Sequence, residues 1–172
     1  AEYDGYWHEG KMQGFGRFLH SNKDIYEGEF VADKANGKGC YTQACGEVYD
    51  GYWSEDKPHG KGQQRLVNGA VYEGDFREGK KHGYGVYNWP DLSVFKGYWK
   101  DNEFNGHGEY VWADGRKYSG EWKGNLMHGF GDMTYEDGRV YKGFYSDDKK
   151  HGHGMYTWPS GKTYDGGWLA GK

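Results

Sequence analysis

The chain has 172 residues and a formal net charge of −4, from 22 lysine and arginine residues and 26 aspartate and glutamate residues. This balance argues against nucleic-acid binding and against a general attraction to anionic lipid. The sequence contains no run of about 20 apolar residues that would cross a membrane as a helix. Aromatic residues are 19% of the chain and glycine contributes 32 residues, so aromatic rings are expected to replace aliphatic side chains in its core.

The motif Tyr-x-Gly-x-Trp occupies residues 3–7 and recurs every 23 residues along the whole chain. A fixed period of this kind marks an array of stacked structural units. Seven full units and the first half of an eighth fit into the sequence, so residues 1–172 are interpreted as a single array. Positions within a unit are counted from the first motif residue, which falls at Tyr3, Tyr26, Tyr49, Tyr72, Phe95, Tyr118, Tyr141 and Tyr164.

Each unit is predicted to form one β-hairpin. Positions 0 to 6 and 12 to 18, which are residues 2–8 and 14–20 in the first unit, alternate with period two and are rich in aromatic residues. Position 8 holds only Gly, Asp or Asn, which tolerate a left-handed backbone, so a turn is expected there. Positions 19 to 21, for example Ala113-Asp114-Gly115, fit a type I turn followed by a left-handed residue, the three-residue hairpin loop.

Successive hairpins are expected to pair edge to edge. The loop places positions 1, 3 and 5 on one face with positions 12, 14, 16 and 18, and on this trough face large rings lie over glycine backbone. The predicted fold class is therefore all-β, an elongated single-sheet antiparallel array of β-hairpin repeats. Position 4 points to the opposite face, where aromatic and acidic residues alternate from one repeat to the next. Two interpretations stay open. The aromatic residues either pack on the sheet, or form a stripe that contacts a second copy or another partner. The position 4 residues are Tyr6, Glu29, Tyr52, Asp75, Tyr98, Glu121 and Phe144.

Two units depart from the pattern at position 21. Lys23 and Leu92 stand where glycine is expected, and Phe95 replaces the motif tyrosine just after Leu92. A left-handed backbone costs an L-residue free energy, so these loops are expected to be strained. We predict a change of the array axis near residues 90–95.

The segments Tyr-Glu-Gly-Glu-Phe at 26–30, Tyr-Glu-Gly-Asp-Phe at 72–76, His-Gly-Lys-Gly at 59–62 and Asp-Gly-Arg-Lys-Tyr-Ser-Gly-Glu-Trp at 114–122 resemble MORN repeats (membrane occupation and recognition nexus). The resemblance covers the whole chain. It implies an elongated ribbon of the kind that accompanies junction-tethering proteins, lipid kinases, methyltransferases and cytoskeletal scaffolds. An array without an attached catalytic domain is similar to the all-MORN scaffold of apicomplexan parasites and its trypanosome relatives, which implies homodimers, cytoskeletal association and a role in cell division.

Three surfaces are predicted to carry contacts. The aromatic trough is the expected surface for protein partners, through Tyr26, Phe30, Tyr49, Trp53, Tyr72, Trp89, Trp99, Trp112, Trp122 and Trp158. The final half-unit has a motif strand without a returning strand, so a homodimer is expected to form through Tyr164, Trp168 and Leu169 at this edge. Position 9 forms a basic rim with two interpretations, a solvated turn or a contact for phosphoinositide headgroups, at Lys11, Lys34, Lys57, Lys80 and Lys149.

Metal binding has little support from residue spacing. The histidines at position 11 stand on hairpins about 9.6 Å apart, too far for one zinc ion to join two of them, so these side chains are expected to bond the adjacent loop. His107 and His153, at position 13, are expected to be solvated. Cys40 and Cys45 are too far apart on a strand to share a disulfide or a metal, and their small number indicates a reducing compartment. No cofactor is predicted, although Cys45 in its turn could meet ligands of a second chain around a zinc ion.

The carboxylates recur with the units and are expected to form cross-strand charge pairs, so no catalytic site is predicted. The favoured function is a non-enzymatic scaffold for protein interaction, self-associating and cytoskeleton-linked, with a cytoplasmic location at the cytoskeleton or a membrane. Two alternatives stay open, a membrane-tethering module that reads phosphoinositides and a regulatory array cut from a larger enzyme.

Overall fold

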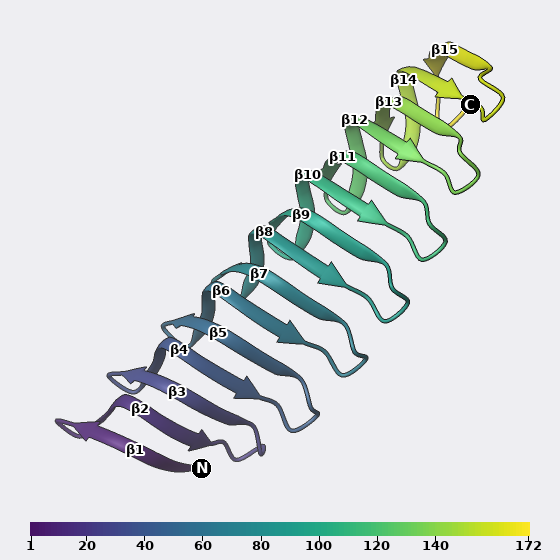
Figure 1. Cartoon of the computed structure of the whole chain (residues 1–172). Coiled ribbons are helices and arrows are strands. Elements are labelled where there is room, and N and C mark those ends of the chain that lie inside the picture. The colour runs from purple at the N-terminus through teal and green to yellow at the C-terminus, as the bar shows by residue number, and fades with distance from the viewer. The chain divides into compact units, whose positions relative to one another are not determined.

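The computed structural model describes residues 1–172 and consists of strands and turns. All strands belong to one antiparallel sheet whose strand order follows the chain (Figure 1), so the predicted fold class is confirmed. The chain divides into two compact units, Ala1–Gly85 and Val86–Lys172, which are described separately below. It contains no helix that is long and apolar enough to cross a membrane.

The first unit contains β1 (Glu2–His8), β2 (Lys11–Leu19), β3 (Ile25–Val31), β4 (Lys34–Thr42), β5 (Val48–Ser54), β6 (Lys57–Arg65), β7 (Val71–Arg77) and the start of β8 (Lys80–Asn88). The second contains the end of β8 and β9 (Val94–Lys100), β10 (Glu103–Val111), β11 (Lys117–Lys123), β12 (Leu126–Thr134), β13 (Val140–Ser146), β14 (Lys149–Thr157) and β15 (Thr163–Trp168). Each repeat therefore supplies one seven-residue strand and one nine-residue strand, as in β3 and β4.

The turn inside each repeat is tighter than the sequence indicated. His8 pairs with Lys11, so only Glu9 and Gly10 lie in the loop, and both have positive φ. Positive φ at both central residues is the geometry of a type I′ hairpin turn, which matches the twist of the flanking strands. The second strand consequently begins at position 9 rather than at the predicted position 12.

The glycine at position 12 accommodates the longer strand. Gly5 pairs with Gly16 whereas Trp7 pairs with Met12, so extra residues on β2 bulge between these two pairs. Gly14 lies inside this bulge with a φ of 74°, a value that L side chains rarely adopt. The bulge brings position 10 onto the trough face opposite position 5, a placement that alternation alone did not indicate.

The three-residue loops form as predicted. In the first, His20 N–H donates to Asp24 O at 2.8 Å and Lys23 N–H donates to His20 O at 3.0 Å. Lys23 and Leu92 take the left-handed conformation with φ of 75° and 74°, and Leu92 N–H still donates to Trp89 O. The turn type is therefore kept at both departures, and the change of axis near residues 90–95 stays a prediction.

The core is a single layer of rings lying on glycine. A Cβ atom added at Gly131 would collide with the Tyr118 ring, and the same holds for Gly62 beneath Tyr49. The hydroxyl of each such tyrosine reaches past the glycines and donates to the carbonyl at position 4, as Tyr118 does to Glu121 O at 2.9 Å. Position 1 and position 5 rings then meet edge to face, with Tyr118 and Trp122 centroids 5.1 Å apart. One sheet thereby buries its own side chains without a second layer.

Neighbouring hairpins are also joined at the type I′ turns. Asp33 N–H donates to Met12 O at 3.1 Å, and its carboxylate accepts from Met12 N–H at 2.8 Å. Asp148 makes the same pair of bonds with Met127. In the third repeat position 10 is Pro58, which has no N–H to donate. The position 8 residue that faces it is Gly79, which has no side-chain acceptor, so the only bond between them runs from Gly79 N–H to Pro58 O.

Candidate functional site

The ten residues predicted to form a partner surface fall into two groups. Seven are core residues, exposed by 9% or less, and serve the sheet itself: Tyr26, Phe30, Tyr49, Trp53, Tyr72, Trp99 and Trp122. The other three, Trp89, Trp112 and Trp158, are half-buried. Only this second group presents ring surface to a partner.

All three accessible tryptophans occupy position 18, the residue immediately before the three-residue loop. Tyr135 holds the same position in the sixth repeat and is also half-buried. Trp89, Trp112, Tyr135 and Trp158 thus stand on four successive loops of residues 86–172, and we call them the loop-edge row. These loops follow β8, β10, β12 and β14 along one edge of the sheet (Figure 1).

Further rings support the loop-edge row from the trough. Trp89 lies 5.3 Å from Tyr110, and Tyr110 lies 4.5 Å from Trp112 between ring centroids. Tyr156 lies 4.7 Å from Trp158. Each of the three tryptophans is therefore held by a position 16 ring, which restricts its orientation.

Basic side chains stack on three members of the row. The Arg116 guanidinium lies 4.9 Å from the Trp112 ring centroid, that of Arg139 lies 4.7 Å from Tyr135, and Lys162 Nζ lies 5.6 Å from Trp158. Such cation–π contacts hold both groups in place.

The two arginines are also paired with carboxylates in their own loops. Arg116 Nε lies 2.8 Å from Asp114 Oδ2, and Arg139 Nε lies 2.7 Å from Asp137 Oδ2. The pKa of Asp114 is lowered by the Arg116 backbone N–H and side chain, and that of Asp137 by the Arg139 side chain and backbone N–H. Both carboxylates are therefore ionised at neutral pH.

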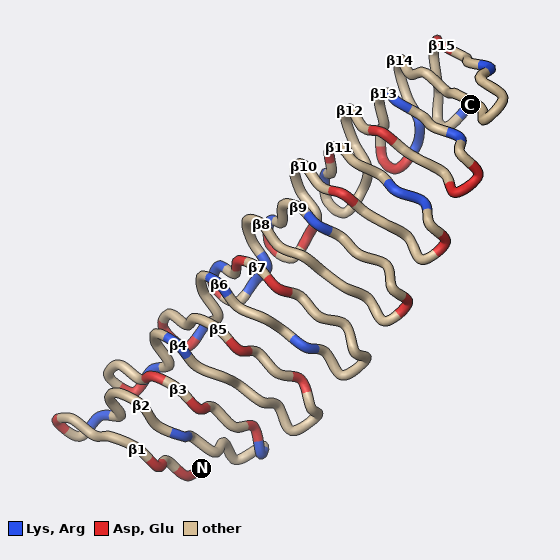
Figure 2. The backbone as a smooth tube through the Cα atoms, in the orientation of Figure 1, with Lys and Arg blue, Asp and Glu red and all other residues tan.

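A cleft of about 430 Å³ opens between two of these loops. Asp114 and Arg116 of one loop line the cleft, together with Tyr135, Glu136, Asp137 and Arg139 of the next. Three carboxylates and two guanidinium groups meet here, so the cleft is slightly acidic. Figure 2 shows that both signs of charge accompany the loops of this part of the chain.

The indole N–H groups distinguish the loop-edge row from the core. Trp53, Trp122 and Trp168, at position 5, donate to the carbonyls of Gly39, Gly108 and Gly154 at 2.9, 3.1 and 3.0 Å. The indoles of Trp89, Trp112 and Trp158 donate no hydrogen bond within the chain. The row therefore offers three half-buried donors to an acceptor from outside.

The floor of the trough is closed by position 10. Lys150 Nζ lies 5.4 Å from the ring centroids of both Tyr141 and Tyr156, and it donates to the Tyr135 hydroxyl at 3.1 Å. In the fifth repeat Phe104 stacks on Phe95, with the two ring centroids 3.9 Å apart. These side chains fill the space between the core rings, so the loop edge carries the accessible ring surface.

Residues 1–85 have no such row. Their position 18 residues are His20, Gln43 and Leu66, and their position 22 residues are Asp24, Glu47 and Ala70. Tyr41 lies near this edge, and its hydroxyl donates to Asp24 Oδ2 at 2.5 Å. Burial, and then the carboxylate of Asp24, raise the pKa of Tyr41 to about 12.

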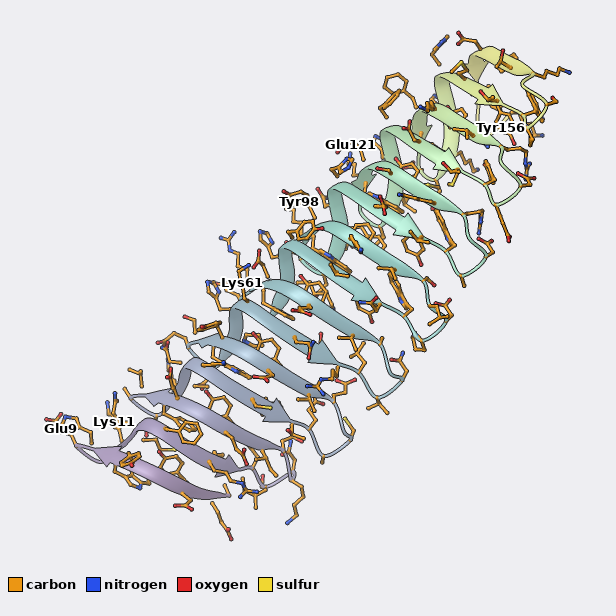
Figure 3. The ribbon with its side chains drawn as sticks, in the orientation of Figure 1. Glu9, Lys11, Lys61, Tyr98, Glu121 and Tyr156 are labelled. Atoms are coloured by element: carbon orange, nitrogen blue, oxygen red, sulfur yellow. The ribbon has the colours of Figure 1, made fainter.

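The opposite face carries the position 4 residues. In residues 86–172, Tyr98 and Glu121 point away from the face that holds Tyr156 (Figure 3). Phe144 is 48% exposed and meets Phe130 edge to face at 5.5 Å. The placement of position 4 on the outer face is therefore as predicted, and its use by a partner stays a prediction.

The predicted lysine rim lies at the type I′ turns, where Lys11, Lys34, Lys57, Lys80 and Lys149 are all exposed. Lys34 Nζ lies 2.7 Å from Glu55 Oε2, so acidic residues at position 7 offset part of the positive charge. Figure 3 places Glu9 and Lys11 at one such turn. Lipid binding through this rim stays a prediction.

Cys45 is exposed in its loop, and its polar contact is with Gln43 Oε1 at 3.5 Å. No group of three or more His, Cys, Asp or Glu residues within the chain is arranged to hold a metal ion. A zinc site shared with a second chain stays a prediction. Among the position 11 histidines, His59 Nδ1 accepts from Glu78 N–H at 3.3 Å, as expected for a residue that bonds the adjacent loop.

The residues predicted to mediate self-association lie on and after β15. Tyr164 is 43% exposed and Leu169 is 71% exposed, whereas Trp168 is half-buried and bonded to Gly154 O. Their role in a dimer stays a prediction.

The fold and the site define a class of protein, an antiparallel array of β-hairpin repeats with a solvent-facing loop edge and no metal cluster of its own. The MORN repeat model matches residues 3–25, 26–44, 49–71, 72–94, 95–115, 118–138 and 141–163. The chain therefore belongs to the MORN-repeat family, a non-enzymatic repeat module. No curated protein matches the chain.

Solved structures with a similar fold include the TCP domain of SAS-4 (dCPAP) from Drosophila melanogaster, in complex with a proline-rich motif of Ana2 (dSTIL). That match has a TM-score of 0.54 and 9% sequence identity, and it covers 90% of this chain and 85% of that domain. The TCP10 domain of CPAP from Danio rerio matches with a TM-score of 0.42 and 16% identity, over 90% of this chain and 82% of that domain. At these identities the likeness concerns the fold alone.

Proposed function

We propose that this MORN array is a protein-interaction scaffold whose contact surface is the loop-edge row of residues 86–172. The observation that carries the proposal is the set of three half-buried indole N–H groups, at Trp89, Trp112 and Trp158, that donate to nothing in the chain. Half-buried aromatic rings with an available polar edge are the residue type that dominates protein interfaces. The similar SAS-4 domain binds a motif of another protein, which is in keeping with this use of the fold.

The proposal extends to what the array assembles with. Once a partner has bound one loop, its next segment meets the neighbouring loop at a high effective concentration. A repeated surface therefore suits a scaffold that organises filaments or other arrays. Cytoskeletal association in the cytoplasm, a role in cell division and self-association through Tyr164, Trp168 and Leu169 belong to this proposal. Light scattering on the intact chain and on the variant Leu169→Asp tests the last of these, since a monomeric mass for the wild type contradicts it.

The proposed surface can be tested without knowing the partner. A library of random peptides is selected on immobilised wild-type chain, and each enriched peptide is then measured against the variant Trp89→Phe/Trp112→Phe/Trp158→Phe. Peptides that bind the wild type and lose affinity for the variant support the proposal. The matched control is Tyr98→Ala, which removes a ring that is 51% exposed on the opposite face of the same part of the chain. If enriched peptides bind both variants equally, or none is enriched, the loop-edge row is not a protein-binding surface.

A further inference from the structure

The loop-edge row has a regular spacing that restricts the shape of its partner. Its members stand on successive hairpins, and since strands lie about 4.8 Å apart, consecutive rings repeat about every 9.6 Å. A partner that touches all four rings must place one contacting residue about every 9.6 Å along its length. The three regular conformations of a peptide differ sharply in this respect.

A polyproline II helix fits the interval. It has three residues per turn and rises about 3.1 Å per residue, so every third residue returns to one side after about 9.3 Å. An extended strand advances about 10 Å in three residues, but its side chains alternate, so every third residue faces the wrong way. An α-helix needs seven residues and about 10.5 Å to return to one side, which loses register by nearly 1 Å at each loop.

The hydrogen-bonding groups of the row point to the same conformation. A polyproline II helix has no internal hydrogen bonds, so its carbonyl groups are free acceptors. The indoles of Trp89, Trp112 and Trp158 are donors without an acceptor in the chain. An α-helix would bring no free carbonyl along its side, because its own N–H groups occupy them.

The cleft between the loops supplies a place for the ring of a proline. It lies between Arg116 on one loop and Tyr135 on the next, and both side chains are held in position, Arg116 by Asp114 and Tyr135 by Arg139 and Lys150. Its three carboxylates outnumber its two guanidinium groups, so a lysine or arginine beside the proline is favoured.

We propose that the loop-edge row of residues 86–172 binds a proline-rich segment in the polyproline II conformation, with proline at every third residue and basic residues between. Four rings engage about ten residues of such a segment. This inference rests on the proposed function, because it names the partner of the same surface. The preformed helix and the preformed rings both keep the entropy cost of binding low.

Fluorescence anisotropy with two dye-labelled decapeptides tests the register. One has proline at its first, fourth, seventh and tenth residues, with alanine, glutamine or lysine elsewhere. The other has the same composition with proline at its first, third, fifth and seventh residues. We expect saturable binding of the first and at least about tenfold weaker binding of the second, since only two of its four prolines, the first and the seventh residue, keep the spacing of three. Equal affinity for the two peptides overturns the inference.

A conservative variant tests the hydrogen bonds. Trp112→Phe keeps an aromatic ring but removes the donor together with the second ring of the indole, so the affinity for the first peptide is expected to fall about threefold to tenfold. Tyr98→Ala, on the opposite face of residues 86–172, is expected to leave the affinity unchanged. Thermal unfolding of each variant establishes that it is folded. Equal loss of affinity in both variants, or no loss in Trp112→Phe, contradicts the assigned role of the indole.

The random-peptide selection separates this inference from the proposed function. Enriched peptides that depend on the loop-edge row and carry proline at a spacing of three support both. Enriched peptides that depend on the row but have no such spacing leave the protein-binding function standing and overturn the polyproline II partner. Failure to enrich any peptide that depends on the row overturns both.

Discussion

Residues 1–85 and residues 86–172 are built from the same repeat and differ where the chain leaves the sheet. Both use tyrosine over glycine and type I′ turns, as Tyr49 over Gly62 and Tyr118 over Gly131 show. At the three-residue loops the first part carries His20, Gln43 and Leu66, whereas the second carries Trp89, Trp112, Tyr135 and Trp158. The comparison teaches that the period determines the interior of both parts, and that the two parts differ in the side chains that they carry at the loop edge.

If the interiors are equivalent, the same glycine substitution must cost the same in both parts. We expect Gly62→Ala and Gly131→Ala each to reduce the free energy of unfolding by about 3 kcal/mol or more, because the new methyl group collides with a pinned tyrosine ring. Urea denaturation measures both. The control is Gly167→Ala, where a Cβ meets nothing within 4 Å and little change is expected. A small effect in one part alone would show that its rings are less tightly seated.

High pH tests whether the rings of both parts are equally protected. Burial, followed by nearby carboxylates, raises the pKa of Tyr49 and of Tyr118 above their ordinary value of 10.0. A raised folded pKa means that the stabilisation is complete below pH 10 and is lost as pH rises above it. Each such tyrosine is expected to remove about 1.4 kcal/mol per pH unit there. Tyr49→Phe and Tyr118→Phe should each flatten the alkaline part of a stability-versus-pH curve by a similar amount.

An unchanged slope in either variant would contradict the protection of that tyrosine. Both variants also lose the hydroxyl bond to the position 4 carbonyl, of 2.8 Å in Tyr49 and 2.9 Å in Tyr118. The loss of this hydrogen bond lowers the free energy of unfolding at every pH below 10 and does not change how steeply that free energy falls above pH 10. The hydrogen bond and the ionisation of the tyrosine are therefore separable in one pH titration.

The bonds between neighbouring hairpins are expected to be equivalent too. Asp33→Ala in the first part and Asp148→Ala in the second each remove the acceptor of a main-chain N–H, at a cost of about 1 kcal/mol in the free energy of unfolding. Gly79→Asp is the matched control, because the facing Pro58 has no N–H to donate and no gain is expected. A gain of stability in this control would contradict the account of these turns.

The smallest effect concerns the two irregular loops, one in each part. Lys23 and Leu92 have the left-handed conformation, which costs an L-residue about 1–2 kcal/mol. Glycine removes that cost and adds about 0.5–1 kcal/mol of chain entropy to the unfolded state. Lys23→Gly and Leu92→Gly are therefore expected to stabilise the protein by about 0.5 kcal/mol each in thermal or urea unfolding. Destabilisation by Leu92→Gly alone would mean that this exposed side chain makes a contact of its own.

The sequence predicted the parts of the fold that repeat. A strict 23-residue period, glycine at position 14 and Asp-Gly at the second turn specify one hairpin geometry, and the loop between Trp112 and Arg116 has the predicted hydrogen bonds. The start of the second strand was misplaced, because the bulge at Gly14 interrupts the alternation on which strand bounds are predicted. Position 10 was assigned to no face for the same reason.

The candidate site was less accessible to sequence reasoning. Trp122 and Trp112 both belong to the predicted trough, yet one is core and the other half-buried. The difference depends on whether an indole reaches the carbonyl of a neighbouring hairpin, as Trp122 reaches Gly108, and a contact across the sheet leaves no mark in a linear pattern. One signal was present, a basic residue four places after three of the four loop-edge aromatics, as in Trp112 and Arg116, whereas Trp89 is followed by Ser93 at that place.

The central claim, that the loop edge rather than the trough interior receives a partner, is tested most directly by the indole N–H resonances of the intact chain. The decapeptide with proline at every third residue is titrated into ¹⁵N-labelled protein, and the side-chain signals are assigned by single Trp→Phe variants. The account predicts that the indoles of Trp89, Trp112 and Trp158 shift together and saturate, while those of Trp53 and Trp122, which are bonded to Gly39 and Gly108, stay in place. Shifts of Trp53 and Trp122 with no movement of the three loop-edge indoles would contradict it.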